Sequence, residues 1–247
     1  MADEAIPAAT LIVAHDRPDG PPELLMVERA EGMAFAAGAL VFPGGRIDDA
    51  DRRLAAGAGA VDAAIVAAIR ETLEETAIPA GLSPEPEHAT ALDLQRELAG
   101  GRDFAELIAA HGLQLDASAL TAFARWVPKF HAVRRFDTSF YVARAPSGER
   151  PPSAIPGECS GAFWITARDA LERAQRGAAK LIFPTRRNLE RLAQHANFEA
   201  IRSDALAHPV DPVTPWVEER DGERFITIPA DLGYPVTQEK LDGLWRG

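Results

Sequence analysis

An amphipathic segment at residues 61–77 constrains this chain more than any other stretch, because it predicts a helix with two opposed faces. At about 100° per residue, one side of the helical wheel is apolar and carries Val61, Ile65, Ile69 and Leu73. The opposite side carries three acids behind Arg70, namely Glu71, Glu74 and Glu75. Like charges at this spacing destabilise a helix by roughly 0.2–0.5 kcal/mol per pair. The acidic face is therefore either a solvated surface or a place where a cation binds.

Composition indicates a globular protein, and the net charge argues against nucleic-acid binding. The chain has 247 residues and a hydrophobic fraction of 47%, which is enough for a globular core. Its formal net charge is -11, which argues against a nucleic-acid-binding surface, since such a surface needs clustered Lys and Arg. A small phosphorylated substrate is compatible with this balance, because a local site can be positive on an acidic protein.

Targeting and redox signals favour the cytoplasm. The single cysteine, Cys159, cannot form a disulfide within one chain, which fits a reducing compartment. No apolar run approaches the roughly 20 residues that span a bilayer, and the N-terminal MADEAIPAATLIVA lacks the basic region of a signal peptide. We therefore expect a soluble cytoplasmic protein with no membrane or nucleic-acid partner.

The rest of the chain predicts a mixture of strands and helices. Strands are expected at 9–14, 24–28, 121–130, 137–144 and 161–165, and further helices at 89–111, near 166–176 and at 185–196. Thr185, after Pro184, is the candidate N-cap of the last of these helices. Residues 46–60 and 145–158 are expected to be loops. Asp221-Gly222, between two extended runs, predicts a hairpin in a C-terminal extension at about 210–230.

Two stretches, at 43–45 and at 70–78, together form the strongest candidate for a functional motif. Pro43-Gly44-Gly45 followed by RETLEETAI at 70–78 resembles the signature of the Nudix hydrolases: Gly, five residues, Glu, seven residues, then Arg-Glu-apolar-x-Glu-Glu-x-Gly-apolar. All charged positions of the second half are present. Thr72 and Ala77 stand where the family usually has an apolar residue and glycine. Ala77 is expected to be tolerated if the helix ends without a left-handed residue.

The first acidic position of the signature has two candidates. Counting forward from Gly45 places it at Asp51, and counting back from Arg70 places it at Asp62. About eleven residues are therefore inserted, and we expect the insertion to be an extended loop at 46–60, with Asp62 opening the helix. An aspartate in a first helical turn is favoured by the helix dipole, so a purely structural role for Asp62 is the main alternative.

An elongated signature of this kind is similar to that of one branch of the family. The stretches FPGGRIDDAD (42–51), AIRETLEETAI (68–78) and WVPKFHAVRRFDTSFYVA (126–143) resemble the coenzyme A diphosphatase-type Nudix proteins of the mammalian Nudix 19 kind and their bacterial relatives. The resemblance covers roughly residues 9–200. It implies an α/β fold in which a mixed β-sheet is sandwiched between α-helices, as a single domain over 1–247 with a helical insertion at about 85–120.

The resemblance also implies an activity. Family members hydrolyse a nucleoside diphosphate linked to another group, using Mg²⁺ or Mn²⁺, and coenzyme A or an acyl-coenzyme A is the favoured substrate here. ADP-ribose, NADH or another dinucleotide is an alternative substrate. A non-catalytic nucleotide-sensing module is a rival, which the presence of all three glutamates opposes.

The resemblance assigns roles to particular residues. The expected metal ligands are Glu71, Glu75, Glu74 and the main-chain carbonyl of Gly45, and the expected catalytic residues are Glu71, Glu74 and Arg70. Mg²⁺ favours oxygen ligands, often one or two carboxylates plus substrate phosphate. The base that activates water is either Glu71 or an acid from a distant loop.

Other residues have weaker assignments. Gly44, Arg134 and Arg135 are candidates for substrate binding, although the arginines are as readily explained by pairing with Asp137 and other surface acids. The insertion at 85–120 is either a substrate lid or a dimerisation element. Trp216 is a candidate for a homodimer surface or for packing of the C-terminal hairpin.

Overall fold

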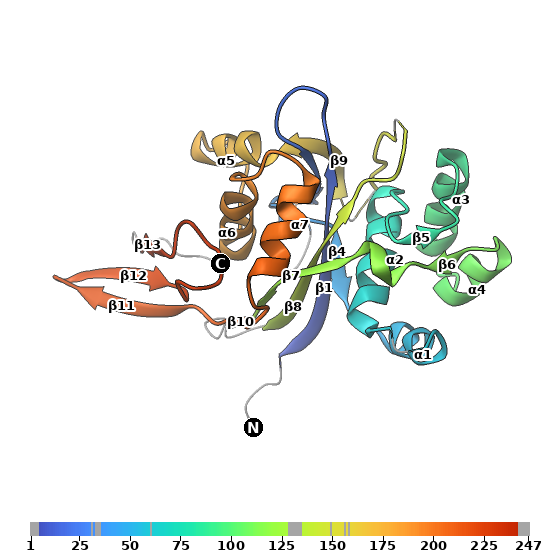
Figure 1. The fold of residues 1–247 in the computed structure, drawn as a ribbon, viewed down its shortest axis with the longest axis horizontal. Helices are drawn as coiled ribbons and strands as arrows, with labels where there is room; N and C mark the ends of the chain where they lie inside the picture. The colour runs from blue at the N-terminus through green and yellow to red at the C-terminus, as the bar shows by residue number, and fades with distance from the viewer. Residues whose placement is uncertain are drawn as a thin grey trace.

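A mixed eight-stranded sheet forms the centre of the molecule in the computed structural model (Figure 1). The structure describes residues 5–30, 32, 36–59, 61–127, 135–148, 150–155, 157 and 159–241. Among these, no helix is long and apolar enough to cross a bilayer. The strands, in spatial order, are β10 (Pro212–Val213), β7 (Thr121–Trp126), β8 (Phe136–Arg144), β1 (Ile6–His15), β2 (Glu23–Arg29) and β3 (Leu40–Val41), with β4 (Gly44–Arg46) paired to β1 and β9 (Cys159–Thr166) paired to β2.

The longest strand, β1, explains why the sheet has two covered faces. It runs parallel to β8 and antiparallel to β2 and β4. Its side chains alternate between two hydrophobic cores: Leu11 and Val13 lie in one, and Ile12 and Ala14 in the other. A strand buried on both faces is a nearly continuous apolar run, as ATLIVA is apart from Thr10.

Helices cover both faces of this sheet, which confirms the predicted sandwich (Figure 1). One core packs against α1 (Asp49–Gly57), α2 (Ala63–Thr76), α3 (His88–Ala99) and α4 (Phe104–Ala110), and the other against α5 (Ala167–Gln175), α6 (Phe183–Leu192) and α7 (Phe198–Ala207). The segment at 85–120 holds α3, α4 and the 3₁₀ helix η1 (Ala117–Ala119), beside a two-stranded sheet of β5 (Leu82–Ser83) and β6 (Gln114–Leu115).

The C-terminal segment forms a separate three-stranded antiparallel sheet of β11 (Trp216–Arg220), β12 (Glu223–Thr227) and β13 (Gln238–Lys240). The two central turn residues, Asp221 and Gly222, have φ of 54° and 78°, which suits a two-residue hairpin. This hairpin projects from the body of the molecule (Figure 1). Trp216 is 39% exposed and lies on β11.

Two local predictions were wrong, and one helix was not predicted. The segment at 46–60, expected to be a loop, contains helix α1, which packs Ala55 into the core next to α2. Thr185 is inside α6 rather than at its start, because the helix already begins at Phe183 with Ile182 as N-cap. Helix α7 was not predicted, although the sequence contains two signals for it. Asn197 is the N-cap, because its side chain accepts a hydrogen bond from the Ala200 amide. The apolar residues that follow at helical spacing are Phe198, Ile201 and Ala205. The strand expected at 121–130 ends at Trp126, and residues 128–130 lie outside the described part of the chain.

Candidate active site

Helix α2 carries the acidic face and begins at a capped end. The Asp62 side chain accepts a hydrogen bond from the Ala64 amide at 2.9 Å, so Asp62 is the N-cap. Three turns later the helix presents Glu71, Glu74 and Glu75. Glu71 and Glu74 have side chains 17% and 24% exposed, whereas Glu75 is only 6% exposed and lies in the interior. The expectation that all three acids lie away from the buried side is therefore wrong for Glu75.

The glycines of Pro43-Gly44-Gly45 bring backbone against this acidic face. The amide of Gly44 donates to Glu75 Oε2 at 3.1 Å. A Cβ at Gly45 would lie 2.3 Å from Glu71 Oε1, and one at Gly44 would lie 2.4 Å from the carbonyl oxygen of Ala9. Since the neighbour of Gly44 is backbone within the central sheet, no side chain fits there. Gly44 therefore lets β4 lie directly against β1, and Gly45 leaves room for the Glu71 carboxylate of α2 beside β4.

Arg70 gathers the acids around one guanidinium group. Its Nε and Nη2 each donate to one oxygen of Asp51 at 2.9 Å, a bidentate pair. Its Nη1 donates to Glu71 Oε1 at 2.9 Å and to Glu74 Oε2 at 3.3 Å, while Nη2 also donates to the Arg46 carbonyl at 3.2 Å. Burial lowers the pKa of Arg70, but the bonds and charges of Asp51 and Glu71 outweigh it and raise the pKa overall. Arg70 is therefore a fixed positive charge at the centre of the cluster.

The two candidates for the first acidic position have different places in the structure. Asp51 lies in the first turn of α1, is 1% exposed, and also accepts a hydrogen bond from the Asp48 amide at 2.9 Å. Asp62 caps α2 and makes no described contact with Arg70. Forward counting from Gly45 thus found the residue that joins the cluster, and the turn of α1 brings it there.

Burial and neighbouring charge set the protonation of Glu71. Loss of water around this carboxyl raises its pKa, the Arg70 charge lowers it, and the charge of Glu74 raises it again, so the pKa lies at about 7. A carboxyl with such a pKa exchanges a proton near neutral pH, as a general base does.

The donor chemistry of this site suits a hard divalent cation. Within the described part of the chain, no three acidic, His or Cys side chains converge as a ready-made cation cage; Arg70 and the Gly44 amide hold the glutamates instead. Mg²⁺ is usually bound by one or two carboxylates plus substrate phosphate rather than by a complete protein cage. Glu71, Glu74 and Glu75, which share one face of α2 beside Gly45, fit that requirement.

The predicted substrate-binding arginines are only partly described. Arg134 lies outside the described residues. Arg135 is half-buried, and its carbonyl accepts a hydrogen bond from the Ile6 amide at 2.8 Å at the start of β1. Asp137, the expected partner of this pair, is bound by Arg125 at 2.8 and 2.6 Å.

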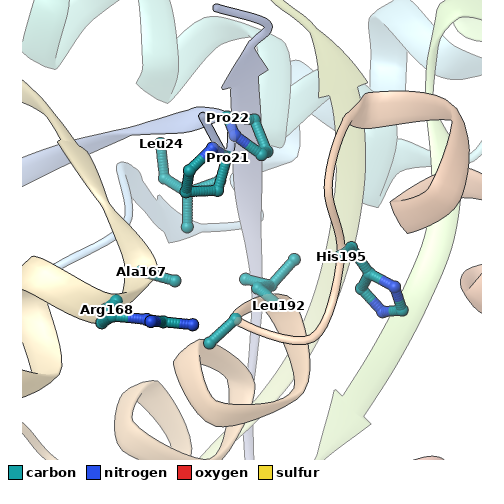
Figure 2. Close-up of a pocket in the computed structure, with 8 residues that line it drawn as sticks. Pro21, Pro22, Leu24, Ala167, Arg168, Leu192 and His195 are labelled. Carbon is teal, nitrogen blue, oxygen red and sulfur yellow. The ribbon is translucent and has the colours of Figure 1, made fainter. Parts of the chain in front are cut away.

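A small pocket is lined by residues other than those of this cluster (Figure 2). It lies where the β1–β2 turn, the start of α5 and the end of α6 meet. The lining residues include no acid and none of the predicted site residues; they are Pro21, Pro22, Leu24, Ala167, Arg168, Leu192, Ala193 and His195. The pocket and the Arg70 cluster therefore share no residue.

Comparison with known proteins identifies the family. The crystal structure of a NUDIX hydrolase from Alicyclobacillus acidocaldarius matches 82% of this chain and 97% of its own, with 30% identity and a TM-score of 0.70. A Caenorhabditis elegans protein named as nudix hydrolase 7 is 24% identical over 216 residues, which are 85% of this chain and 69% of that protein. NudL, an uncharacterized Nudix hydrolase of Cronobacter sakazakii, is 42% identical over 72 residues, which are 29% of this chain and 31% of that protein. No protein-family model matches the chain. With this likeness over nearly the whole length of a solved relative, the chain belongs to the Nudix hydrolase superfamily and acts on pyrophosphate bonds.

Proposed function

We propose that this protein is a Mg²⁺- or Mn²⁺-dependent pyrophosphohydrolase that cleaves a nucleoside diphosphate linked to another group, with coenzyme A or an acyl-coenzyme A as the favoured substrate. The observation that carries the proposal is the Arg70 cluster: one guanidinium holds Asp51, Glu71 and Glu74 beside the glycines of β4. The substrate assignment rests on the resemblance of the stretches at 42–51, 68–78 and 126–143 to coenzyme A diphosphatases.

The proposed roles follow from the contacts of each residue. Glu71, Glu74, Glu75 and the carbonyl of Gly45 would hold the metal, which supplies positive charge to the phosphates and lowers the pKa of bound water. Arg70 keeps Glu71 and Glu74 on one side of the helix. Gly44 and the arginines at 134 and 135 are the proposed contacts to the phosphates.

The reaction requires a water molecule and a base. The oxygen of water bonds to one phosphorus as the bond from that phosphorus to the bridging oxygen breaks. The proposed acceptor of the water proton is the Glu71 carboxylate or an acid from a distant loop. From coenzyme A the products are adenosine 3',5'-bisphosphate and 4'-phosphopantetheine.

The proposal is tested by a substrate panel assayed with Mg²⁺ or Mn²⁺ and read by mass. The panel comprises coenzyme A, acetyl-coenzyme A, ADP-ribose, NADH and diadenosine polyphosphates. We expect coenzyme A compounds to have the highest kcat/KM and the activity to disappear with a chelator. A higher kcat/KM for ADP-ribose or NADH would replace the substrate assignment, and a ligand that binds tightly but is never cut would favour a sensing module.

Removing one ligand charge tests the site itself. Glu74→Gln keeps the shape of the side chain, so we expect the melting temperature to stay within a few degrees while kcat falls by a factor of about 10² to 10³. The control is Glu87→Gln, an exposed residue at the start of α3 with no side-chain capping bond, which should retain full activity. Unchanged turnover in Glu74→Gln would remove Glu74 from the mechanism.

A further inference from the structure

The last turn of α2 is held in place by groups from outside the helix. The final four carbonyls of any helix have no partner in the helix itself. Here the Glu74 carbonyl accepts a hydrogen bond from Gln95 Nε2 at 2.9 Å, and the Thr76 carbonyl accepts one from the Ser153 amide at 2.9 Å. Two remote segments, α3 and the loop after β8, therefore cap the part of α2 that bears the candidate metal ligands.

Gln95 links these three segments with one amide group. Its side chain extends from α3, is 5% exposed, and donates from Nε2 both to the Glu74 carbonyl and to the Ser153 carbonyl, the latter at 2.6 Å. Because both neighbours are acceptors, the nitrogen rather than the oxygen of the amide must face them. The two hydrogens of Nε2 are thus both used, one for the helix and one for the loop.

The loop that meets Gln95 is itself anchored. Arg150 donates to the Pro86 carbonyl at 2.9 Å and to Glu85 Oε1 at 2.6 Å, so the loop is tied to the residues just before α3. Trp164 Nε1, from β9, donates to the Arg150 carbonyl at 3.1 Å. These bonds hold the loop in place against the residues before α3 and against β9, and so position the Ser153 carbonyl that binds Gln95.

The same turn needs external support because of how the helix ends. Ala77, the C-cap, has φ of 57° and ψ of 21°, the left-handed conformation. This conformation costs a residue other than glycine roughly 1–2 kcal/mol. The helix end is therefore strained, and the bonds to its carbonyls oppose an opening of the last turn that would move Glu75 away from the Gly44 amide on β4.

We infer that Gln95 is a positioning residue for the metal site. Gln95 acts through its hydrogen bond to the backbone carbonyl of Glu74, and the helical insertion at 85–120 holds Gln95 in position. The inference rests on the proposed function, because it takes Glu74 and Glu75 as metal ligands. It assigns the insertion a role different from the lid and the dimerisation element considered from the sequence.

The test compares Gln95→Met with wild type in the full-length protein. Methionine has nearly the same length and no donor, so both bonds from Nε2 are lost. The control is Leu98→Ala, which removes buried side chain from the same helix without touching either carbonyl. Both variants should lose overall stability, but only Gln95→Met should affect the end of α2.

Two readouts separate positioning from simple destabilisation. In metal-free protein, the amides of Ala77 and Ile78, which bond to the Leu73 carbonyl and to Thr76 Oγ1, should exchange with deuterium about tenfold faster relative to the Ile69 amide. The dissociation constant of Mn²⁺, measured by water-proton relaxation, should rise about tenfold, as for other groups that orient metal ligands. At saturating Mn²⁺, kcat and KM should stay within about twofold of wild type.

Each outcome has a definite reading. Faster exchange at Ala77 together with weaker Mn²⁺ binding in Gln95→Met, and neither in Leu98→Ala, supports the inference. Unchanged exchange, unchanged Mn²⁺ affinity, or equal effects in both variants overturns it while leaving the hydrolase proposal intact. A wild-type protein that neither binds Mn²⁺ nor cleaves any diphosphate overturns the proposed function and this inference together.

Discussion

At the scale of single residues, Arg70 balances the charges of the candidate site. Its side chain is 12% exposed and contacts Asp51, Glu71 and Glu74. Three carboxylates this close would repel one another without a cation among them. Arg70 therefore offsets the repulsion among these three acids in the folded chain.

The roles of Asp51 and Asp62 can be distinguished by replacing each of them with asparagine. Asp51→Asn weakens a buried, bidentate ion pair, so it should destabilise the protein by about 2–3 kcal/mol and lower kcat/KM by at least about tenfold. Asp62→Asn leaves an equally good N-cap and should change stability by less than about 0.5 kcal/mol. Urea unfolding measures the change in stability, and hydrolysis of the best-cleaved diphosphate of the substrate panel measures the change in kcat/KM. Equal effects of the two substitutions would show that Asp51 does not support the site.

The raised pKa of Glu71 predicts that the stability of the metal-free protein depends on pH. Its pKa rises from the ordinary 4.5 to about 7 on folding, first because of burial. The folded chain therefore binds this proton more tightly than the unfolded chain, and stability falls as pH rises between these two values. Glu71→Gln removes that loss, so it should be more stable than wild type at pH 8, by at most about 3 kcal/mol, with little difference at pH 4.5.

The measurement for Glu71 is the melting temperature of both proteins at pH 4.5 and pH 8, with Glu87→Gln as the baseline for an exposed glutamate. A Glu71→Gln protein that is less stable than wild type at pH 8 would contradict the raised pKa.

At the scale of elements, the end of α2 has alanine where the family usually has glycine, and this alanine strains the backbone. The sequence led us to expect that Ala77 would be tolerated if no left-handed residue was needed, but the helix does end in that conformation. Glycine is favoured at such a position because it has no Cβ. The alanine is held there by the surrounding packing, in which it is fully buried.

Ala77→Gly should therefore be tolerated better than an ordinary buried alanine-to-glycine change. Ala80 is also buried, at 3% exposed, and does not have a positive φ. Both substitutions remove one methyl group and increase the freedom of the unfolded chain, but only Ala77→Gly relieves backbone strain. We expect Ala77→Gly to be more stable than Ala80→Gly by about 1–2 kcal/mol in urea unfolding. The reverse order would mean that the left-handed turn carries no strain.

Helix α1 shows why an element was missed. DADRRLAAG is mostly polar and contains a glycine, so it lacks the long apolar stripe that predicts a helix such as α2. Its stability comes from a capping box between Asp48 and Asp51 and from packing of Ala55 against the core beside α2. Tertiary contacts of this kind stabilise most short helices in proteins.

At the scale of the whole molecule, the C-terminal segment is tied to the second core through buried arginine. Arg191 on α6 is 1% exposed; its Nε donates to Asp204 Oδ2 at 2.7 Å, and its Nη1 donates to the Phe123 carbonyl at 3.1 Å. Its guanidinium lies 5.6 Å from the ring of Tyr234, whose hydroxyl accepts a hydrogen bond from Trp126 Nε1. The chain after α7 is thus joined to β7 and α6.

Arg191→Met should destabilise the protein by about 3 kcal/mol, because it leaves Asp204 largely buried without its main partner. Arg173→Met is the matched control: Arg173 is exposed and lies over the ring of Phe163, so its loss should cost less than about 1 kcal/mol. Urea midpoints measure both, and the Mn²⁺ affinity should be unchanged in each. A loss of Mn²⁺ affinity in folded Arg191→Met would show that the second core influences the site.

The sequence by itself determined the elements whose periodicity is strong and local: the buried strands at the centre of the sheet, the amphipathic α2 with its acids, the glycines that approach it and the C-terminal hairpin. The tertiary structure alone decided that Asp51 rather than Asp62 meets Arg70, that Glu75 is buried, that 46–60 contains a helix, and that Gln95 reaches the end of α2. The contacts of Asp51 with Arg70 and of Gln95 with Glu74 and Ser153 join residues 19 to 58 positions apart along the chain. Local propensity sets the conformation of a segment, whereas such pairings depend on how segments pack against one another.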